Sequence, residues 1–528
     1  MTTQSVPQDI SRPYLYLLVF TAGFATLGME LSASRLLDPW FGNSLVVWAS
    51  LIGLIMLYLA AGYWLGGRVA DRWPDRLVLL RIVAVGAFAV GLIPTVSRPV
   101  LHLASSGLET FDVGLLGGSL AAILVLFAVP VTLLGCVSPF ALRLAIRDVL
   151  GSGEVAGRVS AVSTVGSILG SFLPVLLLIP ALGTRRTFAL LSIVLLLVVV
   201  LGLLQCRRRL SALLVLLGAV LIAWLGFRAA GPLKDTPGLV YEHESAFNYI
   251  QVLDLGVERQ LRLNEGEGIH SVYRPSGGLA DGIWDYFLLA PAFNPAPYRP
   301  DQVQRVAIVG LAAGTMAHLF TEAYGPVRIE GAELDPAILQ AGRDWFAMSI
   351  PNLAAYAMDG RRFLARPPED ASRPYDIIAV DAYRPPYIPF HLTTVEFFAL
   401  ARDRLAPTGV VAVNVGRTHT DYSLVDAVAR TMQAVFPSVY ILDLPDGESS
   451  LGNSLVVGTR QPTTLADLGA NLAAFGSGLL GQVAGRAPAP RVATPPPGAP
   501  LFTDDCAPVE QVVHALVFKY MLGSRDQE

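Results

Sequence analysis

Residues 305–315 read RVAIVGLAAGT, an apolar run that passes into a loop of small residues between Gly310 and Gly314. This pattern predicts a strand, a tight turn and the start of a helix, with small residues that let a ligand approach the backbone. Small residues also serve the packing of a strand against a helix, so the loop alone is a weak indication. The sequence on either side decides between the two interpretations.

Downstream of this loop, apolar strands alternate with helical stretches, which predicts a parallel sheet. Upstream, short alternating runs between residues 239 and 273 predict a small β-hairpin unit. The proline- and alanine-rich segment 484–500 is expected to be a linker or loop. We expect seven strands, in the order of a methyltransferase-type Rossmann-like sheet, at 305–310, 327–335, 354–359, 375–383, 409–415, 439–444 and 453–460.

Acidic residues stand at the ends of three of these strands. Glu333 follows the glycine loop by about twenty residues, where an acid accepts hydrogen bonds from both ribose hydroxyls. Asp359 and Gly360 follow the next strand and are placed to hold an adenine. Asp381 ends the fourth strand, and a side chain there points into the ligand crevice. Each of these acids can also be a helix or turn cap, but together they favour an adenosine-type ligand.

The charge is divided unevenly along the 528 residues, of which 53% are hydrophobic and 15% charged. Residues 1–230 carry a net charge of +7, and residues 231–528 carry −11. This composition excludes a single soluble domain, a disordered chain and a disulfide-stapled mini-protein. The acidity of the second part argues against nucleic acid as a partner. We expect a membrane domain at 1–230, a β-hairpin subdomain at 231–300 and a Rossmann-like domain at 301–528.

A multi-pass helical membrane domain is predicted because the first part contains seven apolar stretches of about 20 residues, the length that crosses a bilayer. Glu30 and Arg35 lie within the first stretch and indicate either a polar site inside the bundle or a structural contact near its surface. Prolines predict kinks in the fourth and fifth stretches, and the pairs Gly62–Gly66 and Gly166–Gly170 predict close helix packing. The stretches are 14–37, 44–66, 77–97, 114–142, 155–182, 186–205 and 210–227.

The sequence offers no pattern for a metal or a phosphate loop. It has no GxxxxGK[ST], HExxH or CxxC motif, and its three cysteines form no evenly spaced framework. The histidines lack ligand spacing. His391 is the only one beside the proposed site, and we expect it to be a structural hydrogen-bonding residue rather than a base.

Several motifs resemble the spermidine synthase (polyamine aminopropyltransferase) family, and most closely its membrane-fused bacterial subgroup. In the second part they are VAIVGLAAGT (306–315), AELDP (332–336), DGRRFL (359–364), YDIIAVDAY (375–383), PFHLTTVEFF (389–398) and LFTDDCAPVE (501–510). In the first part they are GMELSASRLLDPWFG (28–42), GYWLGGRVADR (62–72) and GRVSAVSTVGSILGSFLP (157–174).

The resemblance implies an enzyme that moves an aminopropyl group from decarboxylated S-adenosylmethionine to an amine, putrescine or a related polyamine. Methylthioadenosine is released, and no prosthetic group takes part. Asp381 matches the family's catalytic aspartate, Glu333 its ribose-binding acid, and Asp359 with Gly360 its adenine-contacting pair. Asn248 falls where a donor-binding glutamine usually stands.

The sequence also departs from the family at the acceptor site. Ala313 stands where soluble members carry an aspartate, and Arg384 replaces a second acid. The family's Tyr-His-Glu pattern is Trp284-Asp285-Tyr286 here, so Asp285 can replace a lost anchor; Tyr383 is the other expected acceptor contact. Each missing carboxylate removes charge-assisted hydrogen bonds of about 1.5–3 kcal/mol, which weakens putrescine binding.

Two other functions remain open, namely an S-adenosylmethionine-dependent methyltransferase and a polyamine transporter with a nucleoside-sensing domain. The expected location is the inner membrane, and analogy with the family suggests a homodimer. Donor supply favours a cytoplasmic catalytic domain. The arginine-rich loops at 68–76, 143–158 and 207–209 argue the opposite, because the positive-inside rule places them and the N-terminus in the cytoplasm.

Overall fold

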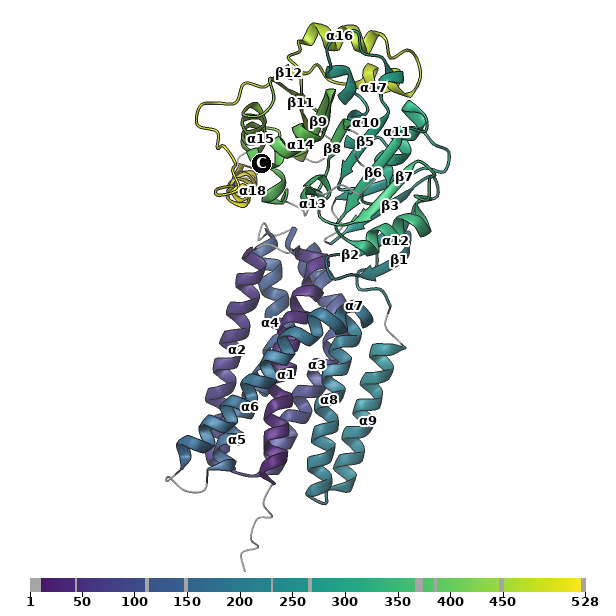
Figure 1. Cartoon of the computed structure of the whole chain (residues 1–528). Helices are drawn as coiled ribbons and strands as arrows, with labels where there is room; N and C mark the ends of the chain where they lie inside the picture. The colour runs from purple at the N-terminus through teal and green to yellow at the C-terminus, as the bar shows by residue number, and fades with distance from the viewer. Residues whose placement is uncertain are drawn as a thin grey trace, which may run out of the picture. The chain divides into compact units, whose positions relative to one another are not determined.

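The computed structural model (Figure 1) describes residues 11–42, 45–109, 114–146, 151–228, 231–264, 268–365, 374–383, 387–445 and 451–523. The chain forms two compact units. One comprises Met1–Gln251 and Leu263–Glu267, and the other comprises Val252–Arg262 and Gly268–Glu528.

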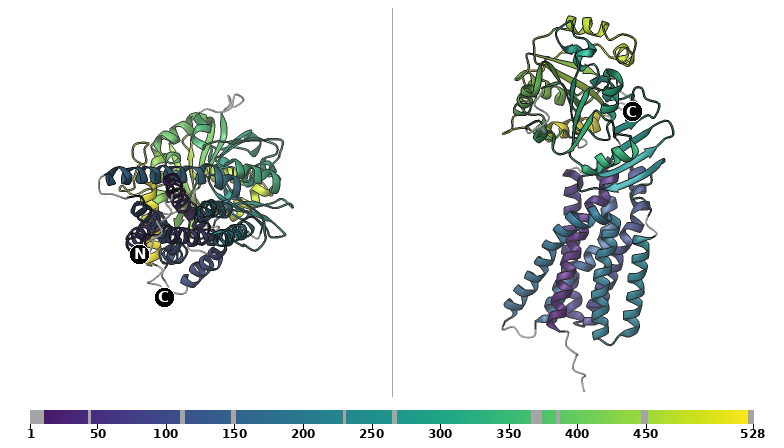
Figure 2. Two further views of the ribbon diagram at one scale, coloured as in Figure 1. Left: turned by 90° about the horizontal axis from the view of Figure 1, so that it is seen from below. Right: turned by 45° about the vertical axis from the view of Figure 1, so that its right-hand side comes forward.

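The first unit is a helical bundle, and seven of its described helical segments are long and apolar enough to cross a membrane, as the sequence predicts. Consecutive helices such as α8 and α9 lie side by side (Figures 1 and 2). The helices are α1 (Arg12–Phe41), α2 (Leu45–Arg72), α3 (Arg76–Glu109), α4 (Gly114–Gly135), α5 (Val137–Ala145), α6 (Ser152–Leu173), the π-helix η1 (Pro174–Leu178), α7 (Ile179–Leu182), α8 (Thr184–Gln205) and α9 (Arg209–Phe227).

Prolines interrupt the two predicted spans in which kinks were expected. Helix α4 gives way to α5 at Cys136, because Pro139 has no N–H to donate to the carbonyl of Gly135. Helix α6 ends immediately before Pro174, and one π-helical turn follows. Pro174 cannot donate to the carbonyl four residues earlier, so the ladder shifts to wider spacing there.

Glycines let the helix backbones approach each other closely. A Cβ atom added to Gly166 or Gly170 would lie 2.2 Å from the carbonyl oxygen of Phe20 or Phe24 in α1, respectively. A Cβ on Gly62 would lie 2.4 Å from the carbonyl oxygen of Thr132. The close packing predicted at both glycine pairs is confirmed, and small-residue contacts of this kind supply association energy between membrane helices.

The second unit contains an eight-stranded mixed sheet in the order β12-β10-β11-β9-β8-β5-β6-β7. Strands β5 to β9 pair in parallel, whereas β9, β11, β10 and β12 pair antiparallel. The strands are β5 (Arg305–Val309), β6 (Arg328–Glu333), β7 (Leu353–Ala357), β8 (Tyr375–Val380), β9 (Leu405–Thr418), β10 (Ser438–Asp443), β11 (Leu451–Thr459) and β12 (Arg491–Val492).

All seven predicted strands of this sheet are present as β5 to β11, and the segment 484–500, expected to be a linker or loop, is irregular except for the end of α17 and the short strand β12. Strand β12 lies inside that segment and pairs with Tyr440 and Ile441 of β10. Two residues suffice because an edge strand pairs on one side only, and an edge tolerates neighbouring prolines.

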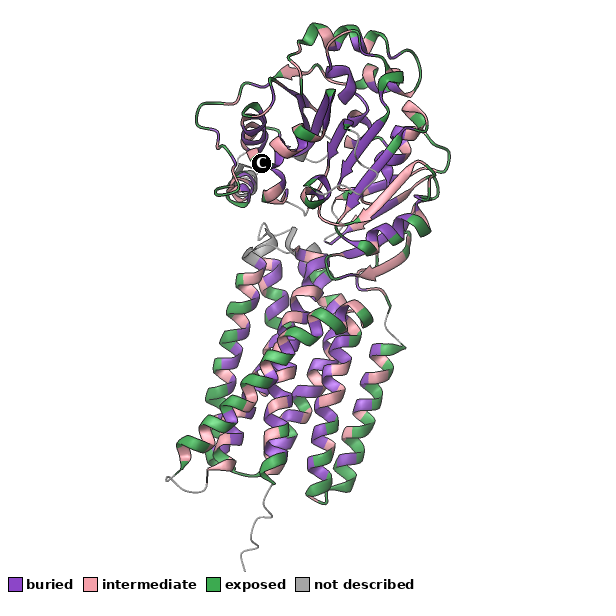
Figure 3. Cartoon of the chain, in the orientation of Figure 1, coloured by how far each residue is buried: buried purple, intermediate pink, exposed green. Residues whose placement is uncertain are grey.

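Both faces of this sheet are covered by helices, which explains why its strands read as continuous apolar runs. Along β5, Val306 and Ile308 belong to the core shared with Phe320 of α11, whereas Ala307 and Val309 belong to the core shared with Phe363 of α13. Strands β5, β6, β8 and β9 are largely buried, whereas the edge strand β7 has intermediate exposure along most of its length (Figure 3). The α-helices are α10 (Ile283–Phe287), α11 (Thr315–Tyr324), α12 (Pro336–Trp345), α13 (Gly360–Ala365), α14 (Val395–Arg404), α15 (Ser423–Gln433), α16 (Leu465–Ala473), α17 (Leu479–Arg486) and α18 (Val509–Gly523).

The predicted β-hairpin unit is a second sheet, of four strands in sequential order β1-β2-β3-β4. Its strands are β1 (Leu239–Glu244), β2 (Tyr249–Asp254), β3 (Arg259–Leu263) and β4 (Ile269–Tyr273). The division between the two units falls within β2 and β3.

Candidate active site

Three predicted site residues meet at the carboxyl edge of the eight-stranded sheet. Val309 of β5 pairs with Ala332 of β6 on one side and with Val380 of β8 on the other. The next residue of each strand is Gly310, Glu333 or Asp381. The parallel register therefore brings the glycine loop and both acids together, as expected for a ligand crevice outside strand ends.

Gly310 is required by the backbone itself. Its φ is +90°, and a Cβ atom there would lie 2.2 Å from the carbonyl oxygen of Asp381. Gly314 has a φ of +95° and precedes α11, where a Cβ atom would lie 2.6 Å from Cγ of Met348. Packing alone thus demands both glycines. The compact loop also leaves the strand edge beside Glu333 free of bulk.

The carboxylate of Glu333 is held by two backbone amides. Ala312 N donates to Oε2 and Asp335 N donates to Oε1, each at 3.0 Å. Burial raises the pKa of Glu333 to about 6 despite these hydrogen bonds. A carboxylate fixed in this way keeps lone pairs for a diol, because each oxygen accepts more than one hydrogen bond.

Together with its pKa of about 6, the ribose-binding role expected for Glu333 from the sequence predicts that affinity for methylthioadenosine falls below pH 6, by about tenfold per pH unit. The ionised form accepts hydrogen bonds from both ribose hydroxyls, whereas the protonated form loses an acceptor. Calorimetric titrations from pH 5 to pH 8 measure this dependence, and Glu333→Gln should bind weakly at every pH. An affinity of the unaltered protein that stays constant over this range would contradict the assignment.

The same pKa shift has a consequence for folding. Because the folded-state pKa lies above the ordinary value of 4.5, the group favours the folded state below pH 4.5, and this contribution is lost as the pH rises through 6.

Asp359 is both a helix cap and half of a hydrogen-bonded pair. Its Oδ1 accepts from the amide of Arg362 in the first turn of α13 at 2.9 Å. Its Oδ2 lies 2.7 Å from Nε2 of His391, and this hydrogen bond holds the pKa of Asp359 below its usual value. His391 therefore makes the kind of hydrogen bond that the sequence led us to expect. The Asp359 side chain keeps 35% exposure, so a ligand can still reach it.

Two exposed apolar side chains flank these acids and were not predicted. Leu334 follows Glu333 and is 50% exposed, while Phe390 precedes His391 and is 55% exposed. Large apolar groups at a strand edge provide flat contact area for a base. Only their positions in the sequence could have indicated them, because each stands next to a residue already singled out for the site.

Asp381 is half-buried and lies between two hydrogen-bond donors. Trp284 Nε1 donates to Oδ2 at 3.0 Å, and Asn414 Nδ2 donates to Oδ1 at 2.8 Å. Burial raises the pKa of the Asp381 carboxyl, which the two hydrogen bonds partly offset. Asn414 Oδ1 is buried and has no hydrogen-bond partner among the residues that the structure describes. Sequence reasoning missed Asn414, although it is the only polar residue in the apolar run 409–415.

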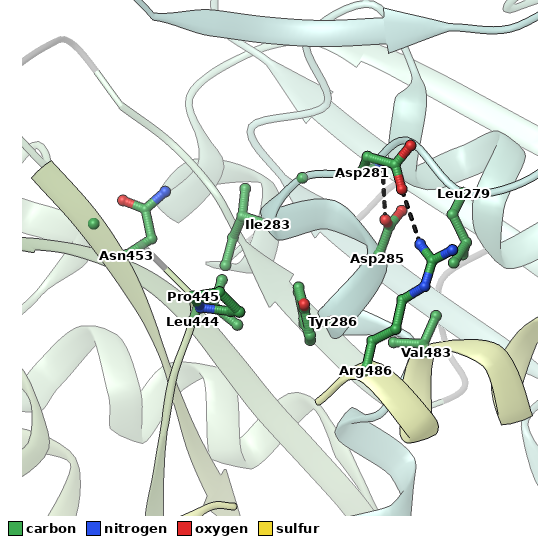
Figure 4. Close-up of a pocket in the computed structure, with 12 residues that line it drawn as sticks. Leu279, Asp281, Ile283, Asp285, Tyr286, Leu444, Pro445, Asn453, Val483 and Arg486 are labelled. Atoms are coloured by element: carbon green, nitrogen blue, oxygen red, sulfur yellow. Dashed lines mark hydrogen bonds and ion pairs between the residues drawn. The ribbon is translucent and has the colours of Figure 1, made fainter. Parts of the chain in front are cut away.

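The expected acceptor contacts are engaged within the protein. Asp285 is 4% exposed and accepts hydrogen bonds from the amides of Ala280 and Asp281, both at 2.8 Å. The hydroxyl of Tyr383 accepts from Gly416 N at 2.5 Å. Asp285 lines a cavity of about 320 Å³ with Tyr286 and Arg486 (Figure 4). The residues that line this cavity include neither Trp284 nor Asp381.

The other predicted positions are less directly informative. Asn248 lies in the first unit. Its backbone N–H donates to Ser245 Oγ at 2.8 Å, and its side-chain Oδ1 accepts from Asn264 Nδ2 at 3.3 Å. Gly360 is needed for packing, because a Cβ atom would lie 2.2 Å from Cγ1 of Val309. Ala313 is buried. Arg384 lies outside the described residues.

Comparison with known proteins gives a consistent set of relatives, although no family model matches the chain. A probable polyamine aminopropyl transferase of Bifidobacterium longum is 30% identical over 53% of this chain and 63% of its own length. The polyamine aminopropyltransferase of Corynebacterium efficiens is 26% identical over 81% of this chain and 82% of its own length. That likeness covers more than the second unit can supply, so it includes part of the helical bundle.

The chain spans less than two thirds of some relatives, for example 48% of a polyamine aminopropyltransferase of Vibrio vulnificus that is 30% identical. Among solved structures, a probable spermidine synthase of Corynebacterium glutamicum has a TM-score of 0.39 and 20% identity, covering 51% of this chain and 97% of that one. The curated relatives confirm the resemblance drawn from the motifs: the chain is a homologue of the polyamine aminopropyltransferases.

Proposed function

We propose that this protein is a membrane-anchored polyamine aminopropyltransferase. It takes the aminopropyl group from decarboxylated S-adenosylmethionine, passes it to an amine and releases methylthioadenosine. The observation that carries the proposal is the half-buried Asp381 carboxylate beside Asn414 Oδ1, which has no hydrogen-bond partner among the described residues. Two adjacent acceptor groups suit an amine, which brings N–H donors and a positive charge.

Asp381 acts as the proton acceptor in this reaction. The acceptor nitrogen attacks the aminopropyl carbon that is bonded to the sulfonium sulfur. A C–N bond forms, and the bond from that carbon to sulfur breaks with its electron pair going to sulfur. The nitrogen loses one proton, which the Asp381 carboxylate takes. The raised pKa of Asp381 brings its basicity closer to the operating pH, which favours general-base catalysis.

Trp284 and Asn414 orient the base. Because they donate to different oxygens of Asp381, the carboxylate is fixed in one rotation and its remaining lone pairs point in defined directions. Holding the reacting groups in place in this way lowers the entropic part of the barrier. No lysine or arginine pairs with Asp381 in the described part of the chain, so its charge remains available to a cation.

The donor is held along the strand edge. Glu333 accepts from the ribose, Asp359 accepts from the adenine amino group, and Leu334 and Phe390 contact the base. Asn248 is a further proposed donor contact, supported by its place in the family pattern. The sulfonium of the donor is attracted to the acidic crevice.

The acceptor is putrescine or a related polyamine, with Asp285 and Tyr383 nearest to it. The cavity that Asp285 lines is about 320 Å³, enough for a short aliphatic amine. Both side chains already satisfy backbone groups, so they provide charge and shape rather than free hydrogen-bonding capacity.

The direct experiment is a turnover assay on the purified full-length protein in detergent. We expect methylthioadenosine to appear, by mass spectrometry, when decarboxylated S-adenosylmethionine is supplied with one of a broad panel of amines. Absence of turnover with every amine would overturn the proposal. Calorimetry with intact S-adenosylmethionine tests the methyltransferase alternative, which requires tighter binding of the intact donor.

Transport is a second candidate function, favoured by Glu30. This side chain is 6% exposed within α1, and its Oε2 has no hydrogen-bond partner among the described residues. A carboxylate buried in a bundle often marks an ion pathway. Polyamine uptake into proteoliposomes that survives Asp381→Asn and is lost in Glu30→Gln would establish transport.

We infer an inner-membrane location with a cytoplasmic catalytic unit, because the donor is made inside the cell. The natural cysteines test this. Cys506 belongs to the catalytic unit and is exposed. Cys206 precedes α9 in the sequence, so one predicted membrane span separates it from the start of the catalytic unit. A membrane-impermeant maleimide should label Cys506 only after the cells are permeabilised, with Cys506→Ser as the control. Labelling of Cys506 in intact cells would place the unit outside, as the positive-inside rule suggests.

A further inference from the structure

The motif LFTDDCAPVE folds into a turn that lies against the start of two helices. Phe502 is fully buried, and its carbonyl accepts a hydrogen bond from Val395 N at 2.9 Å. Thr503 and Cys506 exchange two backbone hydrogen bonds of 3.0 Å. The turn between them presents Asp504 to residues near the proposed donor site, although the motif lies more than 100 residues further along the chain than that site.

Asp504 makes the most directional contact of this turn. Its two carboxylate oxygens each lie 2.6 Å from a terminal nitrogen of Arg361, which is a bidentate pair. The hydroxyl of Thr394 also donates to Oδ1 at 2.8 Å, and the amide of Asp504 donates to Glu396 at 3.0 Å. Bidentate arginine–carboxylate pairs fix geometry as well as distance.

A chain of contacts leads from this pair to the donor site. Arg361 Nη1 also donates to the carbonyl oxygen of His391 at 3.3 Å. The imidazole of His391 in turn lies 2.7 Å from Asp359 Oδ2. Arg361 itself directly follows Gly360 at the start of α13. The Arg361 side chain thus links Asp504 to α13, the helix that Asp359 caps, and to the loop that carries His391.

We propose that Asp504 is a positioning residue for the donor site, acting through Arg361 on His391 and Asp359. The inference rests on the proposed function, since it assigns Asp359 to the adenine of the donor. The Asp504–Arg361 pair sets the distance between α13 and the His391 loop, and this distance sets the direction of the Asp359 oxygen left for the ligand.

A purely structural role fits the exposure of the pair less well. The side chains of Arg361 and Asp504 are 26% and 40% exposed, and ion pairs with this much solvent contact contribute about 0–1 kcal/mol to stability. The turn has its own anchor in Phe502 and in its backbone hydrogen bonds. Removing the carboxylate should therefore leave the fold in place and alter mainly the geometry at Asp359.

The test compares Asp504→Asn with Asp505→Asn, a matched change at the exposed neighbouring acid, in the full-length protein. Calorimetry with methylthioadenosine should show about tenfold weaker binding for Asp504→Asn, the effect typical of losing a group that orients a ligand contact. Asp505→Asn should bind like the unaltered protein. The KM for the donor should rise, while kcat and the KM for the amine stay unchanged.

A double-mutant cycle tests the route of the effect. If Asp504 acts through Arg361, the Asp504→Asn/Arg361→Gln variant should bind no more weakly than Arg361→Gln alone. Equal affinities of Asp504→Asn and Asp505→Asn would overturn the inference, as would a lower Tm accompanied by equal losses for donor and amine. Failure of the unaltered protein to bind methylthioadenosine would instead overturn the proposed function.

Discussion

Asp381→Asn should lower the rate of methylthioadenosine release by about 100-fold or more, the contribution typical of a positioned general base. Asparagine keeps the size of the side chain, and Trp284 and Asn414 remain on either side of it. It cannot accept the proton that the attacking nitrogen must lose. The measurement is turnover at saturating donor and amine, followed by mass spectrometry.

Two comparisons make this result specific. Asp344→Asn changes an exposed acid of α12 and should leave turnover unaltered. Calorimetric binding of methylthioadenosine to Asp381→Asn should remain within the range of the unaltered protein, because the proposed function assigns the nucleoside to Glu333 and Asp359. If Asp381→Asn retained most of its turnover, the assignment of the base would be wrong.

Gly310→Ala should have the largest effect on stability, with a loss of about 3 kcal/mol or more from backbone strain and overpacking combined. Its φ of +90° is unfavourable for alanine, and the new Cβ would meet the Asp381 carbonyl oxygen at 2.2 Å. That oxygen is backbone and cannot swing away like the end of a side chain. Relief requires β5 and the residues after β8 to separate, which also displaces the catalytic carboxylate.

Gly325→Ala separates the two causes of this loss. Gly325 has a φ of +80°, but a Cβ atom there would have no neighbour within 4 Å. It should therefore show the conformational cost alone, about 1–3 kcal/mol for a backbone conformation that is almost exclusive to glycine. Thermal unfolding of both variants, followed by circular dichroism, gives the comparison. Equal Tm values for the two variants would show that the contact with the Asp381 carbonyl oxygen does not contribute to the loss of stability.

Much of the fold was predictable because its periodicities are strong. The apolar stretches of the bundle and the buried strands β5, β6, β8 and β9 are recognisable from their length and composition alone. Strand β12 was missed because two residues carry no periodicity and their pairing depends on β10, which is distant in sequence. The interruption of α6 was anticipated from Pro174, but its π-helical form depends on the hydrogen bonds available after the proline.

The acids of the site were predictable because parallel strands bring their carboxyl ends to one edge, so a strand-end acid is placed by topology. Trp284 and Asn414 were not recognised as partners of Asp381. Trp284 reaches it from α10, and the pairing of β8 with β9 places Asn414 beside it. Such contacts depend on register and on loop paths, which sequence patterns leave undetermined. The turn carrying Asp504 is a similar case, since its motif was noticed but its partner was not.

The triple engagement of Asp359 bears on how donor preference can evolve or be engineered. The same carboxylate caps α13 and pairs with His391, and the proposed function assigns it a third role as a contact of the adenine. Any substitution that retunes base recognition at this position therefore also releases a helix end. The preference for a nucleoside is easier to change at Leu334 and Phe390, because their apolar side chains are exposed and form no hydrogen bonds. A library aimed at modified adenosine donors should keep Asp359 fixed and diversify these two positions.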